Sequence, residues 1–306
     1  MVKEFLYENK RFFYLLIGIV VFSVLVYVVS SSLISFGIIE QEVYIIPVHG
    51  EISLYDSGGL FGGGASAEQI VAEIDAANDD HLISAIILDI NSPGGTVVAT
   101  REIAAAVEAS EKPVVAWLRE VAASGGYWIA ASSDAIVADP ATMTGSVGVI
   151  GSYLEFSDFL DEYGIKYERL TSGEFKDTGS PYKELTASER SMLQSKIDRL
   201  NSMFIQHVSE RRALNEGQIR AISSAEIFLG VEAKQIGLVD VLGSKNEAII
   251  VAQKLANLDS SRVTEFSEEI SFTEQLINTF SMQSYLIGQG IGDALVKQDK
   301  DFQVLA

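Results

Sequence analysis

The sequence predicts an α/β fold with a largely parallel sheet, preceded by one apolar helix at the N-terminus. Strand and helix patterns alternate along the chain with short connections, which is typical of α/β proteins. Residues 83–90, ISAIILDI, form a nearly continuous apolar run, as expected of a strand buried on both faces of a parallel sheet. Residues 12–29 carry no charge and account for the apolar helix.

The uncharged N-terminal segment is long enough to span a bilayer. Residues 12–29 read FFYLLIGIVVFSVLVYVV, a run of 18 residues. A cleavable signal peptide, the alternative, usually has a shorter apolar region of about 7–15 residues that ends in an A-x-A-like site. Residues 30–32 are three serines and match such a site poorly. We therefore expect residues 1–39 to form a cytoplasmic N-terminus and a retained transmembrane anchor.

Basic residues flank this segment on one side only. Lys3, Lys10 and Arg11 precede or begin it, and the next basic residue is Arg101. Because basic residues stay on the cytoplasmic side, the N-terminus is expected in the cytoplasm and the rest of the chain outside it. The expected location is the cell membrane, with a single pass whose helix contacts lipid.

Composition excludes several classes of function. The net charge of −20 gives the chain no electrostatic reason to bind nucleic acid, so no nucleic-acid partner is expected. The chain has no cysteine, which excludes disulfides, thiolate metal sites and a cysteine nucleophile. Its three histidines, His49, His81 and His207, are scattered. We therefore expect no metal and no cofactor.

The first half of the body repeats strand and helix. Residues 43–48, VYIIPV, are rich in β-branched side chains and precede His49 and Gly50, which favours a first strand. Residues 67–77 carry apolar side chains at helical spacing. Residues 57–64 are glycine-rich and predict a mobile surface loop. The other elements predicted in this half are strands at 83–90, 113–118 and 135–138 and helices at 96–109 and 124–132.

The second half is predicted to contain more helix than strand. Its predicted elements are a strand at 166–171, a long helix at 186–211, a glycine-bounded segment at 230–243 and a helix at 246–258. They close a domain that we place at residues 40–262. Residues 263–306 differ, because a capping box at 271–274 overlaps apolar residues spaced by four, Phe272, Leu276 and Phe280. This predicts an amphipathic C-terminal tail, either a docking or regulatory appendage or a packing helix.

Two glycine pairs follow predicted strands. Residues 91–95 read NSPGG, and Ser124 precedes Gly125 and another glycine at the start of a predicted helix. Each motif alone suits a tight turn or a helix N-cap. Together they suit acyl transfer, which needs a nucleophile beside backbone N–H groups aimed at the developing oxyanion. Ser124 could be that nucleophile, with Gly125 and either Gly94 or Gly95 as donors.

A serine nucleophile needs a base, and the histidines are poorly placed to supply one. Lysine is the other option, in the Ser-Lys variant of the mechanism. Lys176 is the best candidate among the lysines after the anchor, because it follows the strand predicted at 166–171 and lies near a glycine. Negative charges close to its amine would oppose loss of the proton. We therefore expect Glu174 and Asp177 to face solvent.

Five motifs in the same order resemble a known family, the signal peptide peptidase A proteases of the crotonase and Clp protease structural group. They are NSPGG at 91–95, ASGGYWIA at 123–130, MTGSVGVI at 143–150, GEFKDTGSP at 173–181 and EAKQIGLVDVLGS at 232–244. The resemblance extends over about residues 43–258 and implies a crotonase-like fold of repeated ββα units.

The resemblance also implies a set of site residues. It makes Ser124 the nucleophile and Lys176 the general base, with Gly125 and Gly94 or Gly95 as the oxyanion hole. Residues 144–146 would form part of the wall of the substrate site, namely Thr144, Gly145 and Ser146. Single-domain members of the family assemble into octamers on the membrane in which serine and lysine meet across neighbouring subunits, so the resemblance implies a homo-octamer here.

The predicted function is that of a membrane-anchored serine endopeptidase. The resemblance implies peptide substrates such as signal peptide remnants, cut in or at the membrane. Two alternatives remain: a catalytically inactive membrane scaffold of the same fold, and a crotonase-type enzyme acting on acyl-coenzyme A thioesters. The predicted topology disfavours the second, because coenzyme A is a cytoplasmic metabolite.

Overall fold

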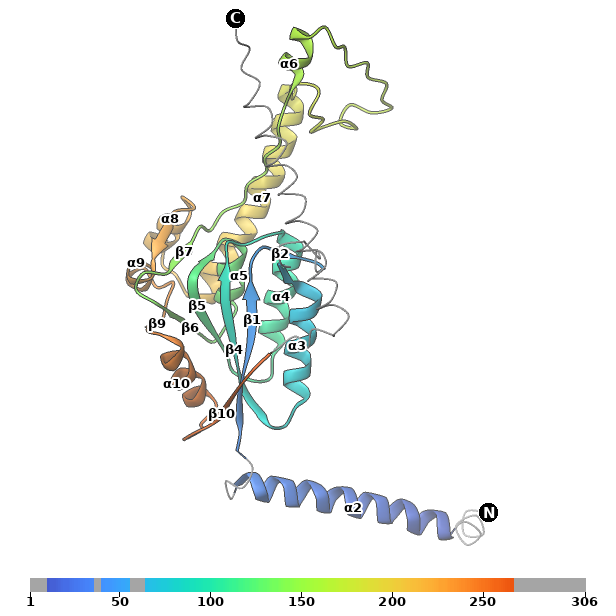
Figure 1. Cartoon of the computed structure of the whole chain (residues 1–306), viewed down its shortest axis with the longest axis vertical. Helices are drawn as coiled ribbons and strands as arrows, with labels where there is room; N and C mark the ends of the chain where they lie inside the picture. The colour runs from blue at the N-terminus through green and yellow to red at the C-terminus, as the bar shows by residue number, and fades with distance from the viewer. Residues whose placement is uncertain (1–9, 36–39, 56–63, 267–306) are drawn as a thin grey trace, which may run out of the picture.

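The computed structural model describes residues 10–35, 40–55 and 64–266. Most of the predicted glycine-rich loop and nearly all of the predicted C-terminal tail lie outside these residues. The body is a mixed α/β fold around a parallel-rich sheet, as predicted (Figure 1).

The sheet follows the order β10-β1-β4-β5-β6-β9, and every pairing along this path is parallel. The strands predicted at 43–48, 83–90, 113–118 and 135–138 all belong to it. The bounds are β1 (Glu42–His49), β4 (Ile83–Ser92), β5 (Val114–Ala123), β6 (Ala135–Ala138), β9 (Val241–Leu242) and β10 (Arg262–Glu265).

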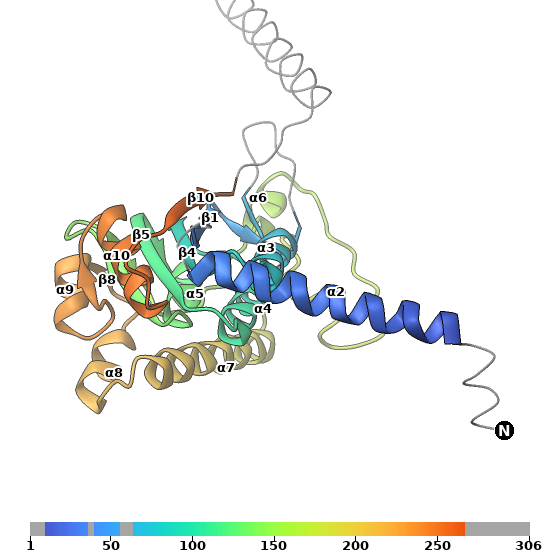
Figure 2. The same cartoon turned by 90° about the horizontal axis from the view of Figure 1, so that it is seen from below.

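Helices cover both faces of the sheet. On one face lie α3 (Ala67–Asp79), α4 (Val97–Ala109) and α5 (Gly125–Ala131), and on the other lies α10 (Lys245–Leu255) (Figures 1 and 2). Alternate residues of β4 enter the two cores. Ile86 and Leu88 pack in the first, and Ala85 and Ile87 pack in the second. This double burial explains why residues 83–90 are apolar almost throughout.

The strand β5 takes part in two ladders, one after the other. Its first half pairs with β6, and its last residues, Val121 to Ala123, pair with β7 (Met143–Gly145). An antiparallel strand, β8 (Ile227–Leu229), extends β7. The small elements nearby are β2 (Ile52–Ser53), β3 (Ala65–Ser66), α8 (Glu216–Ile222) and α9 (Gly230–Gln235).

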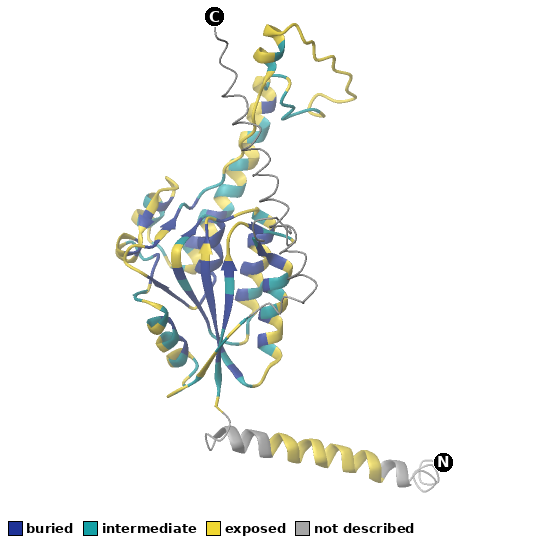
Figure 3. Ribbon diagram, in the orientation of Figure 1, coloured by how far each residue is buried: buried dark blue, intermediate teal, exposed yellow. Residues whose placement is uncertain are grey.

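The long helix α7 (Ala187–Arg211) begins with a complete capping box between Thr186 and Glu189, close to the predicted boundary. Its C-terminal half buries Phe204 and Val208 against the body. Its N-terminal half extends away from the sheet and supports an arm, residues 150–185, which includes α6 (Ser157–Glu162) (Figure 1). The burial pattern in Figure 3 shows this arm as mostly exposed.

The strand predicted at 166–171 is wrong. These residues form no strand, and each of them is exposed. The segment lies on the arm, where no sheet edge is available to pair with it.

The N-terminal helix α2 spans Lys10–Ser35. Every side chain described in it, from residue 14 to residue 28, is exposed (Figure 3). By the combined measure of length and hydropathy, no helix in the described parts of the chain could cross a membrane.

Candidate active site

Ser124 stands at the end of β5, in the N-cap position of α5. Its backbone has φ 52° and ψ −121°, a region that residues with a side chain rarely adopt. Two hydrogen bonds hold this conformation: the Ser124 N–H donates to the Gly145 carbonyl at 2.9 Å, and the Ser124 carbonyl accepts from the Trp128 N–H at 2.9 Å. The hydroxyl does not cap α5. The ordinary role of an N-cap serine therefore does not explain this residue.

The two glycine pairs meet at Ser124, as predicted. A Cβ on Gly94 would lie 2.7 Å from the Gly125 nitrogen and 2.9 Å from the Ser124 Cβ. A Cβ on Gly125 would lie 3.2 Å from the Gly95 nitrogen. Only glycine permits these approaches, and Gly94 also has φ +105°.

The hydrogen bonds distinguish Gly95 from Gly94 as an oxyanion donor. The Gly94 N–H already donates to the Ser92 Oγ at 3.1 Å. At Gly95, a parallel bridge to Ile52 uses the neighbouring Gly94 carbonyl and Thr96 N–H. The Gly95 N–H takes no part in this bridge, and the Gly95 nitrogen lies next to Gly125. As the first residue of α5, Gly125 has an N–H without an intrahelical acceptor. The geometry favours Gly95 and Gly125 as the pair.

A small cavity of about 20 Å³ opens beside Ser124. Apart from Ser124 and Thr100, its lining is backbone and apolar side chain. The lining residues are Gly95, Val97, Thr100, Ser124, Gly125, Trp128, Gly148, Val149 and Phe204. The sequence analysis did not place Thr100, Trp128 or Phe204 at this site, because they reach it from three different helices.

The segment predicted as a wall of the substrate site has another role within one chain. The Thr144 side chain is buried, and its hydroxyl donates to the Ala122 carbonyl at 2.6 Å, which fastens β7 to β5. Gly145 supplies the carbonyl that holds Ser124. Ser146 has φ +50° and is half-buried. Gly148 and Val149, a few residues further on, line the cavity instead.

Lys176 lies on the arm and is exposed, and it is not among the residues that line the cavity. Its neighbour Glu174 accepts a hydrogen bond from Ser188 at 3.0 Å, which places the lysine beside the N-terminal end of α7. Phe204, near Ser124, is 17 residues along that helix from Ala187, a distance of about 25 Å. One chain therefore does not bring Ser124 and Lys176 together.

The two carboxylates beside Lys176 differ from each other. Glu174 is exposed, as predicted. The prediction for Asp177 is wrong, because its side chain is only 12% exposed and pairs with Arg169 at 2.6 Å and with Lys183 at 3.7 Å. These two cations draw the carboxylate into the arm. No ion pair between it and Lys176 occurs among the described residues.

His207 belongs to a polar cluster that the sequence did not reveal. Its Nε2 lies 3.0 Å from the Ser132 Oγ, and its Nδ1 lies 3.7 Å from Glu108 Oε1. Burial lowers the pKa of His207, and the Glu108 charge opposes this shift. The order Ser, His, Glu resembles a hydrolytic triad. Ser132 is buried at the C-terminus of α5, however, and lines neither the cavity beside Ser124 nor the larger cavity between β1 and α3.

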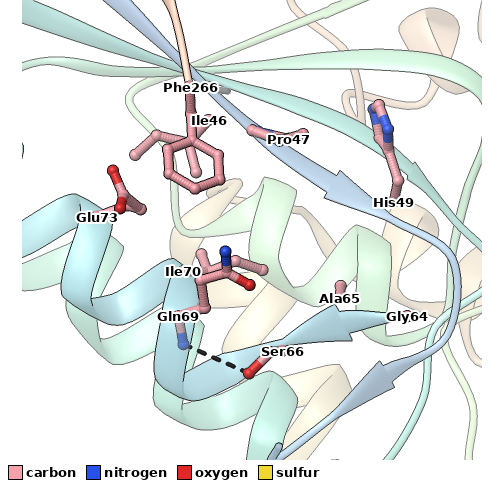
Figure 4. A pocket seen from close by; sticks show the side chains of 10 residues that line it. All are labelled: Ile46, Pro47, His49, Gly64, Ala65, Ser66, Gln69, Ile70, Glu73 and Phe266. Atoms are coloured by element: carbon pink, nitrogen blue, oxygen red, sulfur yellow. Dashed lines mark hydrogen bonds between the residues drawn. The ribbon is translucent and has the colours of Figure 1, made fainter. Parts of the chain in front are cut away.

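A larger cavity of about 380 Å³ lies between β1 and α3 (Figure 4). Its one serine, Ser66, accepts a hydrogen bond from the Gln69 N–H at 3.4 Å and thereby caps α3 (Figure 4). The larger of these two cavities therefore has no serine free to act as a nucleophile, and the volume of a cavity alone does not identify the candidate active site. Within the described residues, no group of three or more histidine, cysteine, aspartate or glutamate side chains is arranged to hold a metal ion.

Comparison with known proteins identifies the family. The profile of peptidase family S49 matches residues 106–259, about half of the chain, and that of the NfeD1b N-terminal domain matches residues 42–155. A protein of Methanocaldococcus jannaschii, provisionally named a protease, is 32% identical over 74% of this chain and 73% of its own length.

Two bacterial relatives also carry the names of proteases. Protease 4 of Haemophilus influenzae is 31% identical over 85% of this chain, which spans only 42% of that relative. A protein of Enterococcus faecium, provisionally named signal peptide peptidase SppA, is 27% identical over 79% of this chain and 71% of its own length. The chain belongs to peptidase family S49, in agreement with the sequence motifs.

Proposed function

We propose that this protein is a serine endopeptidase whose nucleophile is Ser124. The observation that carries the proposal is the strained backbone of Ser124. Its hydroxyl makes no cap hydrogen bond to α5 and lies beside the N–H groups of Gly95 and Gly125. Two N–H groups next to a serine hydroxyl suit the oxyanion of an acyl-transfer reaction.

We infer that the base is Lys176 of a neighbouring copy. The length of α7 between Ala187 and Phe204, about 25 Å, supports this assignment, because it keeps Lys176 of the same chain far from Ser124 and a base must come within hydrogen-bonding reach of the serine. The arm exposes large apolar side chains, which suit contact with other copies. They include Ile150, Leu154, Phe159, Tyr163 and Leu170. The family resemblance suggests a homo-octamer.

In the proposed reaction, the neutral Lys176 amine accepts the proton of the Ser124 hydroxyl as Oγ attacks the scissile carbonyl carbon. The N–H groups of Gly95 and Gly125 donate hydrogen bonds to the oxyanion. The resulting ammonium returns the proton to the leaving amine, and the peptide bond breaks. Water then attacks the acyl-enzyme, with the amine again as base, and releases Ser124 and the carboxylate product.

We propose further that residues 12–29 anchor the protein in the cell membrane, with the body outside the cytoplasm. The uncharged stretch in the sequence supports this, and it extends beyond the side chains described for α2. The basic residues before it support the orientation. The substrates we propose are peptides such as signal peptide remnants, by analogy with the name of the Enterococcus faecium relative.

Labelling with a fluorophosphonate probe tests the nucleophile. The full chain in detergent should be labelled, and Ser124→Ala should abolish the label. Ser132→Ala is the matched control, since this buried serine also contacts a histidine but should leave labelling intact. A scaffold, or a thioester enzyme that uses no serine nucleophile, would show no labelling that depends on Ser124.

Protease added outside intact cells tests the topology. Trypsin should digest the body in right-side-out vesicles and leave a tag at the N-terminus intact. If the body is digested only after the vesicles are lysed, the proposed orientation is wrong. An enzyme acting on acyl-coenzyme A thioesters in the cytoplasm would then again be an alternative function.

A further inference from the structure

The hydroxyl of Thr100 is buried without a hydrogen-bond partner among the described residues. Thr100 lies on the first turn of α4 and is only 1% exposed, and its Oγ1 is among the few buried side-chain atoms left without a partner. A buried hydroxyl without a partner is unfavourable, and such groups in native proteins usually have a function or an occupant that satisfies them.

The hydroxyl is directed at the reactive site. A Cβ on Gly125 would lie only 2.5 Å from Thr100 Oγ1, so the hydroxyl is packed directly against the residue that follows the nucleophile. Thr100 also lines the cavity beside Ser124. The other side chains there, apart from Ser124, are apolar: Val97, Trp128, Val149 and Phe204. Thr100 is therefore the polar group in an otherwise apolar cavity next to the nucleophile.

The cavity is small, which restricts what it can hold. Its volume of about 20 Å³ suits about one water molecule, or the terminal atom of a very small side chain. Trp128 and Phe204 are themselves buried, and their rings stack at 4.4 Å, so these walls do not yield easily. Alanine and serine are the side chains that fit, and they differ by one hydroxyl.

We propose that Thr100 determines specificity by hydrogen bonding to the hydroxyl of a serine at P1, the residue on the N-terminal side of the cleaved bond. The proposal rests on the proposed protease function. A P1 serine would satisfy the Thr100 hydroxyl, whereas a P1 alanine would leave it without a partner and close off access to water. The enzyme should therefore prefer serine to alanine at this position.

The test uses two peptides that differ only in serine or alanine at P1, cleaved by the full-length assembled protein. The measured quantity is the ratio of the two kcat/KM values. Thr100→Val keeps the shape of the side chain and replaces the hydroxyl with a methyl group. It should lower the serine-to-alanine ratio by about tenfold, the worth of one neutral hydrogen bond. Thr100→Ser, which keeps the hydroxyl, should retain the preference.

Thr96→Val is the matched control. Thr96 is the N-cap residue of α4, one turn before Thr100; it is exposed, makes no side-chain cap hydrogen bond and does not line the cavity. The Thr96→Val substitution should leave the serine-to-alanine ratio of kcat/KM unchanged. A Thr100→Val enzyme that cleaves both peptides with the wild-type ratio would overturn the proposal and leave Thr100 a packing residue. Failure of the wild-type protein to cleave either peptide would instead overturn the proposed function, and this inference with it.

Discussion

Ser124 occupies a backbone conformation that is normally reserved for glycine. Its φ of 52° and ψ of −121° are kept by the Gly145 carbonyl and by the first turn of α5. A residue in such a region stores strain of order 1–3 kcal/mol. Glycine, which adopts this region without strain, should therefore be the more stable residue here.

This strain makes a testable prediction. Ser124→Gly should raise the free energy of unfolding by about 1 kcal/mol, because relief of the strain exceeds the entropy that glycine adds to the unfolded chain. Ser124→Ala keeps the Cβ and should bring no such gain. Thermal unfolding of both variants in detergent would measure the difference. Equal melting temperatures for the two would show that the backbone is not strained.

Sequence reasoning at the residue scale singled out Ser124, Gly94, Gly95 and Gly125 as candidates, because glycine pairs that follow predicted strands can be recognised in the sequence alone. It could not choose between Gly94 and Gly95, since that choice depends on the hydrogen bond from the Gly94 N–H to Ser92. Thr100 was also missed. A threonine within a helix carries no mark of a buried hydroxyl that lacks a partner.

At the scale of elements, the junction of α5 and α7 links the nucleophile to the arm. Trp128 of α5 stacks on Phe204 of α7 at 4.4 Å, and one turn further along α7 His207 contacts Ser132. Arg211 donates a hydrogen bond to the Ser132 carbonyl at 2.6 Å. Two layers, one aromatic and one polar, therefore fix α7 against the helix that begins at Ser124.

The polar layer should make stability depend on pH. Burial lowers the pKa of His207 in the folded state below its usual value of about 6.5, while Glu108 and Arg211 act in opposite directions on it. The unfolded chain therefore binds the proton more readily. The contribution of neutral His207 to stability should be complete above about pH 6.5 and should be lost as the pH falls through the lower folded-state pKa.

Denaturant unfolding between pH 8 and pH 5 would measure this effect. His207→Gln should flatten part of the pH dependence, because glutamine does not titrate. His81→Gln is a control, since that histidine is exposed in the turn between α3 and β4. An unchanged pH dependence in His207→Gln would exclude this histidine as the source.

The elements themselves were predicted well where burial determines the pattern. The parallel strands of the sheet and the helices α3, α4, α5 and α7 follow from apolar periodicity and from caps such as Thr186. The strand at 166–171 failed because its apolar side chains are exposed on the arm. Periodicity reports that a segment has an apolar face, but it does not report what covers that face.

At the scale of the whole molecule, the two residues predicted to react with each other lie at opposite ends of α7. The sequence motifs predicted Ser124 as the nucleophile and Lys176 as the base. Their separation within one chain depends on the direction in which α7 leaves the body, and no local pattern encodes that direction.

Mixing two inactive variants tests whether neighbouring copies complete the site. Ser124→Ala and Lys176→Ala should each be inactive as homo-oligomers. Co-assembled in equal amounts, they should recover about a quarter of the wild-type activity, because about one junction in four joins an intact serine to an intact lysine. Peptide cleavage after unfolding and joint reassembly is the measurement. Mixtures that stay inactive would require a dyad within one chain.

The attachment of α7 by its C-terminal half alone has a mechanical consequence. The stretch of α7 from Phe204 back to Ala187 is a lever of about 25 Å, so a rotation of about 2° at the aromatic stack moves its far end by about 1 Å. An error of that size at a reacting group can cost about a hundredfold in rate. If Lys176 is the base, the end of the arm would therefore need a second contact, such as one with a neighbouring copy, to hold the amine in position.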